Sequence, residues 1–97
     1  MRTNYCGEIT KKLLGEEVTV CGWVHRRRDH GGVIFLDLRD TTGIVQLVIN
    51  PDAGESFKIA EDVRGEYVLR ATAKVDPRPE ESANKDLNTG EIELNVK

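Results

Sequence analysis

Apolar and polar residues alternate along most of this chain, in segments that glycine and proline residues separate. The alternation is clearest in residues 91–96, which read EIELNV, and an apolar residue also recurs at every second position in residues 34–38 and 45–49. Successive residues of a strand point to opposite faces of a sheet, so this period of two predicts strands with one buried face. Together with β-branched and aromatic residues it predicts five strands, at residues 17–29, 33–40, 44–50, 66–75 and 91–96.

The first predicted strand is unusually long and contains a glycine, Gly22. A glycine inside a strand often marks a bulge or a bend. We therefore predict a curled first strand, as a small barrel needs, with the irregularity at Gly22. One extra residue there reverses the face of every later residue, so alternation leaves open which way Arg26 and Arg28 point, although these two share a face.

Between the third and fourth strands the apolar period changes to that of a helix. Residues 56–63 carry apolar side chains at helical spacing, which are Phe57, Ile59, Ala60 and Val63. Pro51 ends the preceding strand, because proline cannot donate to a strand ladder. The order of three strands, one short helix and two strands predicts an all-β fold, the five-stranded Greek-key barrel of the oligonucleotide-binding (OB) fold.

We expect one domain over residues 1–97, because no linker-like or low-complexity segment divides the chain. Residues from about 1 to 15 should form a cap, with Ile9, Leu13 and Leu14 against the barrel. No apolar run approaches the roughly 18 residues that a membrane-spanning helix needs, and the N-terminus lacks the apolar segment of a secretory signal. We therefore expect a cytoplasmic protein.

The overall charge is slightly acidic, but the basic residues are clustered. Acidic residues number 17 and basic residues 14, so the formal net charge is −3. A general nucleic-acid binder usually carries a basic surplus, and the total charge argues against that class. Arg26, Arg27 and Arg28 nevertheless lie together. They form either a local binding patch or the solvated end of a strand.

The residues show no motif for metal binding or catalysis. Cys6 and Cys21 lie too far apart for a zinc-binding pair, and His25 and His30 complete no zinc spacing. We expect buried thiols and no metal. No serine or cysteine has a histidine placed to activate it, and no carboxylate pair has an acid–base arrangement, so we expect no catalytic residue.

Strand parity separates a core face from an outer face. The predicted inward residues are the apolar sets of the second, third and fifth strands, which are Ile34, Leu36, Leu38, Val45, Leu47, Ile49, Ile92, Leu94 and Val96. The outer face then carries Phe35, Gln46 and Glu93. An outward aromatic ring near arginine and amide side chains is typical of single-strand nucleic-acid binders, where bases stack on the ring. Alternatively, Phe35 covers the N-terminal cap or a second domain.

Longer segments of the chain resemble a known family. The most specific are residues 22–40, which read GWVHRRRDHGGVIFLDLRD, and residues 43–46, which read GIVQ. They closely resemble the N-terminal anticodon-binding domain of bacterial-type aspartyl-tRNA synthetases, and the likeness continues through residues 1–7, 75–80 and 89–93. The resemblance implies a tRNA-binding OB barrel. It also implies that ATP, magnesium and aspartate are used by a class II catalytic domain of the same polypeptide, in a homodimer, and that domain is absent from residues 1–97.

The resemblance also implies a role for individual outer-face residues. Phe35 matches the ring that stacks on an anticodon base, and Gln46 matches the amide that reads the central uracil. Glu93 matches the carboxylate that reads guanine at the first anticodon position; its alternative is a strand-end carboxylate paired with Arg39 or Lys74. The positions that match residues near the loop backbone and the third base are Arg26, Arg28, Arg78 and Asn84. Asp76 and Ser82 depart from the family there.

The sequence leaves open which tRNA this domain recognises. His30 matches the residue of family members that accept both aspartate and asparagine tRNAs, whose anticodons differ at the third base, but Glu81 does not match the small residue that often accompanies it. The anticodon domain of an asparaginyl- or lysyl-tRNA synthetase is an alternative, although residues 26–35 favour the aspartyl branch. A freestanding single-strand binder or a protein-interaction barrel is the alternative from a different class.

Overall fold

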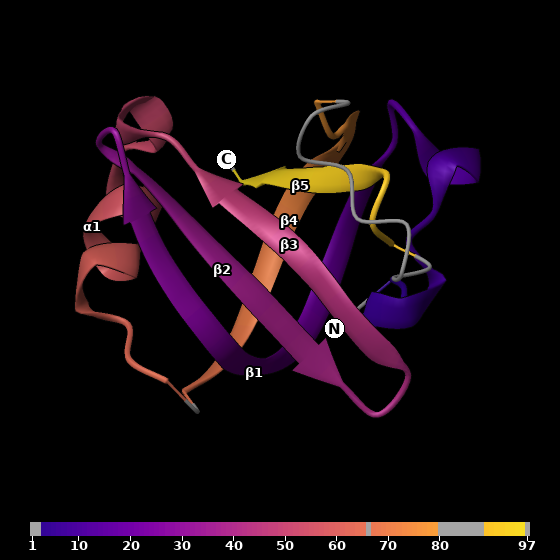
Figure 1. Ribbon diagram of the computed structural model, residues 1–97, viewed down its shortest axis with the longest axis horizontal. Helices are drawn as coiled ribbons and strands as arrows, with labels where there is room; N and C mark the ends of the chain where they lie inside the picture. Colours follow the sequence, from indigo (N-terminus) through magenta and orange to yellow (C-terminus); the bar gives the residue numbers. More distant parts are fainter. Residues whose placement is uncertain (1–2, 66, 80–88, 97) are drawn as a thin grey trace.

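Five antiparallel or parallel strand pairs close the chain into a barrel (Figure 1). The computed structural model describes residues 3–65, 67–79 and 89–96. The barrel order is β1-β2-β3-β5-β4, and the strands are β1 (Glu17–His30), β2 (Val33–Asp40), β3 (Gly43–Ile49), β4 (Val68–Pro77) and β5 (Ile92–Val96). One α-helix, α1 (Glu55–Asp62), lies between β3 and β4 and follows a 3-10 helix, η3 (Pro51–Ala53). The predicted five-stranded OB fold is confirmed. Among the described residues, no helix is long and apolar enough to span a membrane.

Strand β1 is long because it serves two neighbours. Its first half, to Trp23, pairs with β4, and its second half, from Trp23 to His30, pairs with β2. The predicted bulge at Gly22 was wrong, since the register shifts between Val24 and Arg26 and leaves His25 as the extra residue. Gly22 is instead a point of close approach, where an added Cβ would lie 2.3 Å from the carbonyl oxygen of Arg39.

The bulge at His25 decides which way the arginine cluster points. Before the bulge, Trp23 is paired with Arg39, and after it Arg26 is paired with Asp37. Arg28 is in turn paired with Phe35. Directly paired residues share a face of the sheet. Arg26 and Arg28 therefore lie on the outer face with Phe35, which alternation without a bulge would have reversed.

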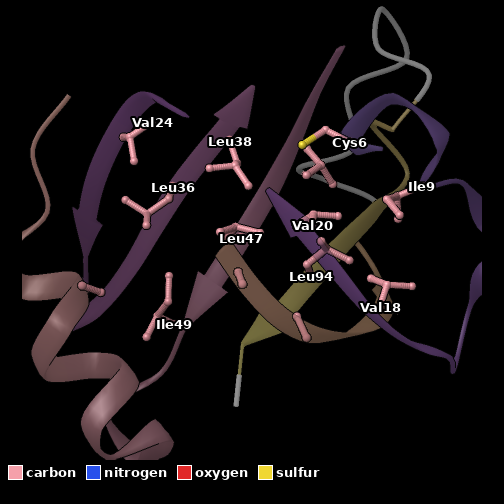
Figure 2. Packing of buried hydrophobic residues seen from close by; sticks show 14 of the residues in the cluster. Cys6, Ile9, Val18, Val20, Val24, Leu36, Leu38, Leu47, Ile49 and Leu94 are labelled. Atoms are coloured by element: carbon pink, nitrogen blue, oxygen red, sulfur yellow. The ribbon is translucent and has the colours of Figure 1, made fainter. Parts of the chain in front are cut away.

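The core lies inside the barrel and is filled by alternate strand residues (Figure 2). All the residues predicted to face inward are buried except Val96, which is partly buried and packs against the core. At one end of the barrel, Cys6 and Ile9 of the N-terminal segment are fully buried. At the other end α1 lies beside Ile49, so the segment and the helix close opposite ends (Figure 2).

The N-terminal cap consists of two 3-10 helices, η1 (Cys6–Glu8) and η2 (Lys11–Leu13). Leu13 packs against the core as predicted, but Leu14 is 41% exposed and its predicted contact was wrong. Leu14 follows the end of η2, where the chain turns at Gly15 with a φ of 86° to begin β1. The cap therefore packs only some of its apolar side chains against the core, and Leu14 is not one of them.

Arg27, the middle residue of the arginine cluster, holds α1 against the barrel. Its Nη1 donates to the carbonyl oxygens of Glu61 at 2.7 Å and Val63 at 2.9 Å. Carbonyls at the end of a helix lack partners within the helix, so a cation there satisfies them and favours the helix dipole. The guanidinium also pairs with Asp29 at 3.1 Å. Arg27 thus has a structural role.

Asp40 joins the N-terminal cap to the turn between β2 and β3. Its carboxylate accepts hydrogen bonds from the backbone N–H of Cys6 at 2.7 Å and from the Oγ1 of Thr42 at 2.6 Å. Burial opposes ionisation of Asp40, but these hydrogen bonds outweigh it and hold its pKa below the ordinary value. Burial, with a smaller contribution from Asp40, raises the pKa of the Cys6 thiol to about 12. Both cysteines are free, and Cys21 is only partly buried.

We expect Asp40→Asn to lower the free energy of unfolding at pH 7 by about 2 kcal/mol, because charge-assisted hydrogen bonds become neutral ones. The folded-state pKa of Asp40 is below its ordinary value of 3.8, so the carboxylate stabilises the fold above that pH. This contribution is lost as the pH falls through the folded-state pKa. Urea unfolding of both proteins at a series of pH values measures the effect, with exposed Asp52→Asn as the control. A difference between Asp40→Asn and wild type that is constant down to low pH would contradict the role of the charge.

Candidate nucleic-acid interface

Polar and charged side chains gather on the outer face of β1, β2, β3 and β5. The register makes two adjacent rows of residues across the sheet. One row contains Arg28, Phe35 and Val48, and the next contains Arg26, Asp37 and Gln46. Glu93 of β5 reaches the second row through its contact with Gln46. The predicted stacking ring, amide and carboxylate therefore lie on one continuous surface.

Arg28 is the centre of a hydrogen-bonded network on this face. Its Nη2 donates to Asp37 Oδ1 at 3.1 Å and to Gln46 Oε1 at 3.0 Å. Its guanidinium carbon lies 5.8 Å from the centroid of the Phe35 ring, within reach of a cation–π interaction. The Nε atom of Arg28 is buried without a hydrogen-bond partner among the described residues. The network orders Phe35 and Gln46 relative to each other.

Both polar atoms of the Gln46 amide form hydrogen bonds. Oε1 accepts from Arg28, and Nε2 donates to Glu93 Oε1 at 3.4 Å. Gln46 is only 6% exposed, although its strand position faces outward. An amide oxygen has two lone pairs and an amide nitrogen two hydrogens, so one acceptor site and one donor site remain. A partner that offers one donor and one acceptor would match these two sites.

Glu93 lies between basic and acidic neighbours. Burial raises its pKa above the ordinary value of 4.5, the positive charge of Arg78 acts against that rise, and the charge of Asp76 adds to it. Burial likewise lowers the pKa of Arg78, while the carboxylates of Glu93 and Asp37 oppose this shift. Glu93 hydrogen-bonds to Gln46, and the described contacts include no pair with Arg39 or Lys74.

The face extends to Asn50 after β3, to Asp76 on β4 and to Asn95 on β5, none of which was predicted as a site residue. Asn50 Nδ2 donates to Asn95 Oδ1 at 3.2 Å, and Asn95 Nδ2 donates to Asp76 Oδ2 at 3.3 Å. Asp37 was also missed as a site residue, although it lies two residues after Phe35 in β2 and therefore shares its outward parity. The available signal was an acidic residue, Asp37, between Phe35 and Arg39 on the same face of β2. This pattern does not show that Asp37 pairs with Arg28 of β1.

The remaining predicted residues lie at the edges of the face. Arg26 and His30 are exposed on β1, on the same side as Phe35. Arg78 follows β4, and its Nε donates to the carbonyl oxygen of Ile92 at 3.3 Å. Asn84 lies outside the described residues, as do Ser82 and Glu81. Within the described residues no group of His, Cys, Asp or Glu has the arrangement of a metal site.

The outer face combines chemical groups that suit the recognition of nucleic-acid bases. The Phe35 ring offers a stacking surface, the Gln46 amide offers a donor and an acceptor, and the Glu93 carboxylate accepts hydrogen bonds. A family model described as an OB-fold nucleic acid binding domain of the tRNA anti-codon type matches residues 18–97. The chain belongs to this OB-fold family. Family membership and the outer-face chemistry agree on nucleic acid as the class of ligand.

Part of each of two solved tRNA synthetases is similar in structure to this OB-fold domain. Asparaginyl-tRNA synthetase from Pyrococcus horikoshii, complexed with asparaginyl-adenylate, has 32% sequence identity and a TM-score of 0.79 over 96% of this chain and 20% of that one. Aspartyl tRNA synthetase from Entamoeba histolytica has 19% identity and a TM-score of 0.75, over 90% of this chain and 18% of that one, and shows the fold alone. The chain thus spans about a fifth of the length of these synthetases.

The same fold also occurs in a protein that binds another protein. OBody AM2EP06, solved bound to hen egg-white lysozyme, has 26% identity and a TM-score of 0.82 over 99% of this chain and 88% of that one. The fold alone therefore does not select the ligand. The side chains on the outer face have to do so.

Proposed function

We propose that this chain is the anticodon-binding domain of an aspartate–tRNA ligase and that it binds the anticodon loop of aspartate tRNA. The observation that carries the proposal is the connected cluster of Phe35, Gln46 and Glu93 on one face of an OB barrel. These are the three positions that match the family's stacking ring, central-base reader and first-base reader. Their side chains come from three different strands, so the sequence motif and the fold support the same site independently.

Each residue has a chemical role in the proposed complex. Phe35 stacks on an anticodon base, and Gln46 donates to a carbonyl oxygen of the central uracil while it accepts from N3–H. Glu93 accepts two hydrogen bonds from the N1–H and N2–H₂ edge of guanine at the first position, and guanine alone among the bases offers that edge. Arg26 and Arg78 contact the phosphate backbone of the loop in this proposal.

The parent enzyme in this proposal carries a class II catalytic domain that uses ATP, magnesium and aspartate, and it acts as a homodimer in the cytoplasm. An asparaginyl-tRNA synthetase is the second candidate, because the Pyrococcus horikoshii enzyme is 32% identical. Aspartate and asparagine anticodons differ at the third base, so Phe35, Gln46 and Glu93 serve both candidates equally. The residues that would distinguish the two candidates, by their contacts near the third base, are His30, Arg78 and Asn84. A third possibility is an enzyme that accepts both the aspartate and the asparagine tRNA.

Binding of anticodon stem-loops tests the proposal. Wild type should bind the aspartate tRNA stem-loop more tightly than one with a replaced anticodon, and Phe35→Ala should weaken binding by roughly 1 to 3 kcal/mol with the fold retained, because a stacked base loses its ring. Tyr67→Ala, which removes a half-exposed aromatic ring just before β4 and outside the proposed set of base-reading residues, should leave binding unchanged. Equal binding of both loops by wild type would contradict anticodon recognition, and equal binding of bare oligonucleotides would favour a general single-strand binder.

A further inference from the structure

We infer that Asp37 is a positioning residue that makes Gln46 selective for uracil over cytosine. Asp37 holds Arg28, and Arg28 fixes the orientation of the Gln46 amide before RNA arrives. The inference rests on the proposed function, in which Gln46 reads the central base of the anticodon. It adds a specificity-determining residue that need not touch the base.

The geometry of Arg28 carries the first step. Both contacts are made by the same nitrogen, Nη2, which lies 3.1 Å from Asp37 Oδ1 and 3.0 Å from Gln46 Oε1. A guanidinium nitrogen of this kind has two hydrogens, so each contact uses one of them. In the described part of the chain, Asp37 is the only ion-pair partner of Arg28. The Asp37 side chain is 21% exposed, so it anchors Arg28 in a partly desolvated site where a charge-assisted bond is strong.

The chemistry of the neighbours dictates which way the Gln46 amide faces. Arg28 can only donate, so the amide atom beside it must be the oxygen. Ionised Glu93 can only accept, so the amide atom beside it must be the nitrogen. A reversed amide would place its NH₂ against a guanidinium and its oxygen against a carboxylate. The two neighbours therefore select one of the two amide orientations, and Gln46 is too buried, at 6% exposure, for water to replace them freely.

Arg28 is the more important of the two neighbours once RNA is bound. In the proposed complex Glu93 turns its carboxylate to guanine, which competes for its 3.4 Å contact with Gln46. The hydrogen bond from Arg28 to Oε1 then remains as the orienting contact. Its persistence depends on Asp37, because an unanchored arginine side chain has many rotamers and regains its hydration in solvent.

Amide orientation decides which pyrimidine fits. Uracil presents a donor at N3, so the atom opposite N3 must be the amide oxygen. Cytosine presents an acceptor at N3 and a donor at N4, so a base in the same position needs the reversed amide. A fixed amide therefore rejects cytosine, whereas an amide that is free to turn accepts either base. Loss of Asp37 should reduce discrimination more than affinity.

The experiment compares aspartate-tRNA stem-loops that carry uracil or cytosine at the central position. Wild type should prefer uracil by about tenfold or more, and Asp37→Asn should bring that ratio to within about threefold of one. The affinity of Asp37→Asn for the uracil loop should fall by less than about tenfold. Asp29→Asn removes the same charge from β1 of the same hairpin, where the carboxylate pairs with Arg27 rather than Arg28, and should keep the wild-type ratio. Gln46→Ala should abolish the preference.

A second measurement separates this inference from the proposed function. In the free domain, the two side-chain N–H resonances of Gln46 should be shifted from those of a solvated amide in wild type and Asp29→Asn, and should move toward them in Asp37→Asn. If Asp37→Asn keeps the wild-type base ratio while Gln46→Ala loses it, Asp37 does not orient Gln46. If wild type shows no base preference, the proposed role of Gln46 fails, and unchanged amide resonances in Asp37→Asn would then overturn the positioning role as well.

Discussion

Leu36→Ala is expected to lower the free energy of unfolding by about 2 to 5 kcal/mol. Leu36 is 2% exposed and is paired with Leu47 across β2 and β3, so its truncation leaves a gap at the centre of the barrel. The loss combines the transfer free energy of the removed methyl groups with the cost of a cavity that the closed sheet cannot fill. Urea unfolding followed by circular dichroism measures the change.

Leu14→Ala provides a control with the same chemical change. Leu14 is 41% exposed, so the same truncation there should cost less than about 1 kcal/mol. Phe35→Ala provides a second comparison, because Phe35 is adjacent to Leu36 and lies on the opposite face. If Phe35→Ala unfolds the domain while Leu36→Ala does not, the assignment of inner and outer faces is inverted, and the proposed binding face is inverted with it.

The second large effect is expected at Glu93. Replacing guanine by adenine at the first anticodon position should cost wild type on the order of 2 to 4 kcal/mol of binding free energy. Adenine lacks the N2 donor, and its N1 is an acceptor that faces the carboxylate. Glu93→Gln should shrink this preference without restoring affinity for guanine, because an amide can donate to adenine N1 but accepts at only one atom from guanine.

Stem-loops that differ only at the first anticodon base measure this preference directly. Glu91→Gln is the matched control, since Glu91 lies just before β5 and pairs with Lys11 at 3.0 Å on the exposed surface. It should leave the guanine-to-adenine ratio unchanged. A purely structural Glu93 would instead lower stability in Glu93→Gln with the ratio unchanged, and equal ratios for wild type and Glu93→Gln would show that Glu93 is not the reader.

Much of the fold follows from local patterns. The bounds of β2 were predicted at both ends, and those of β3, α1 and β5 to within one residue. The β4 strand begins two residues later than predicted and continues to Pro77, whose ring ends the ladder only after the strand has paired with Ile92. Strand boundaries depend on the partner strand as well as on local preference, and the pairing with β5 determines where β4 ends.

The candidate site was predicted by residue type rather than by contact. Parity placed Phe35 and Glu93 on the outer face, and both are there and partly buried. Parity also placed Gln46 outward, yet it is 6% exposed. Arg28, which reaches Gln46 across β2, and Glu93 of β5 both contact its amide, and no local pattern contains these contacts between strands. The roles of these residues in reading bases remain predictions.

The sequence by itself determined the two faces of β2, β3 and β5, because an alternating period of two is a property of each strand alone. Only the tertiary structure decided the facing of the arginine cluster. The extra residue is His25 rather than Gly22, and its position depends on where β1 leaves β4 and joins β2. For the same reason Arg27 holds α1 while Arg28 holds Gln46. These partners are distant in the sequence, so long-range strand pairing has to bring them together before their hydrogen bonds can form.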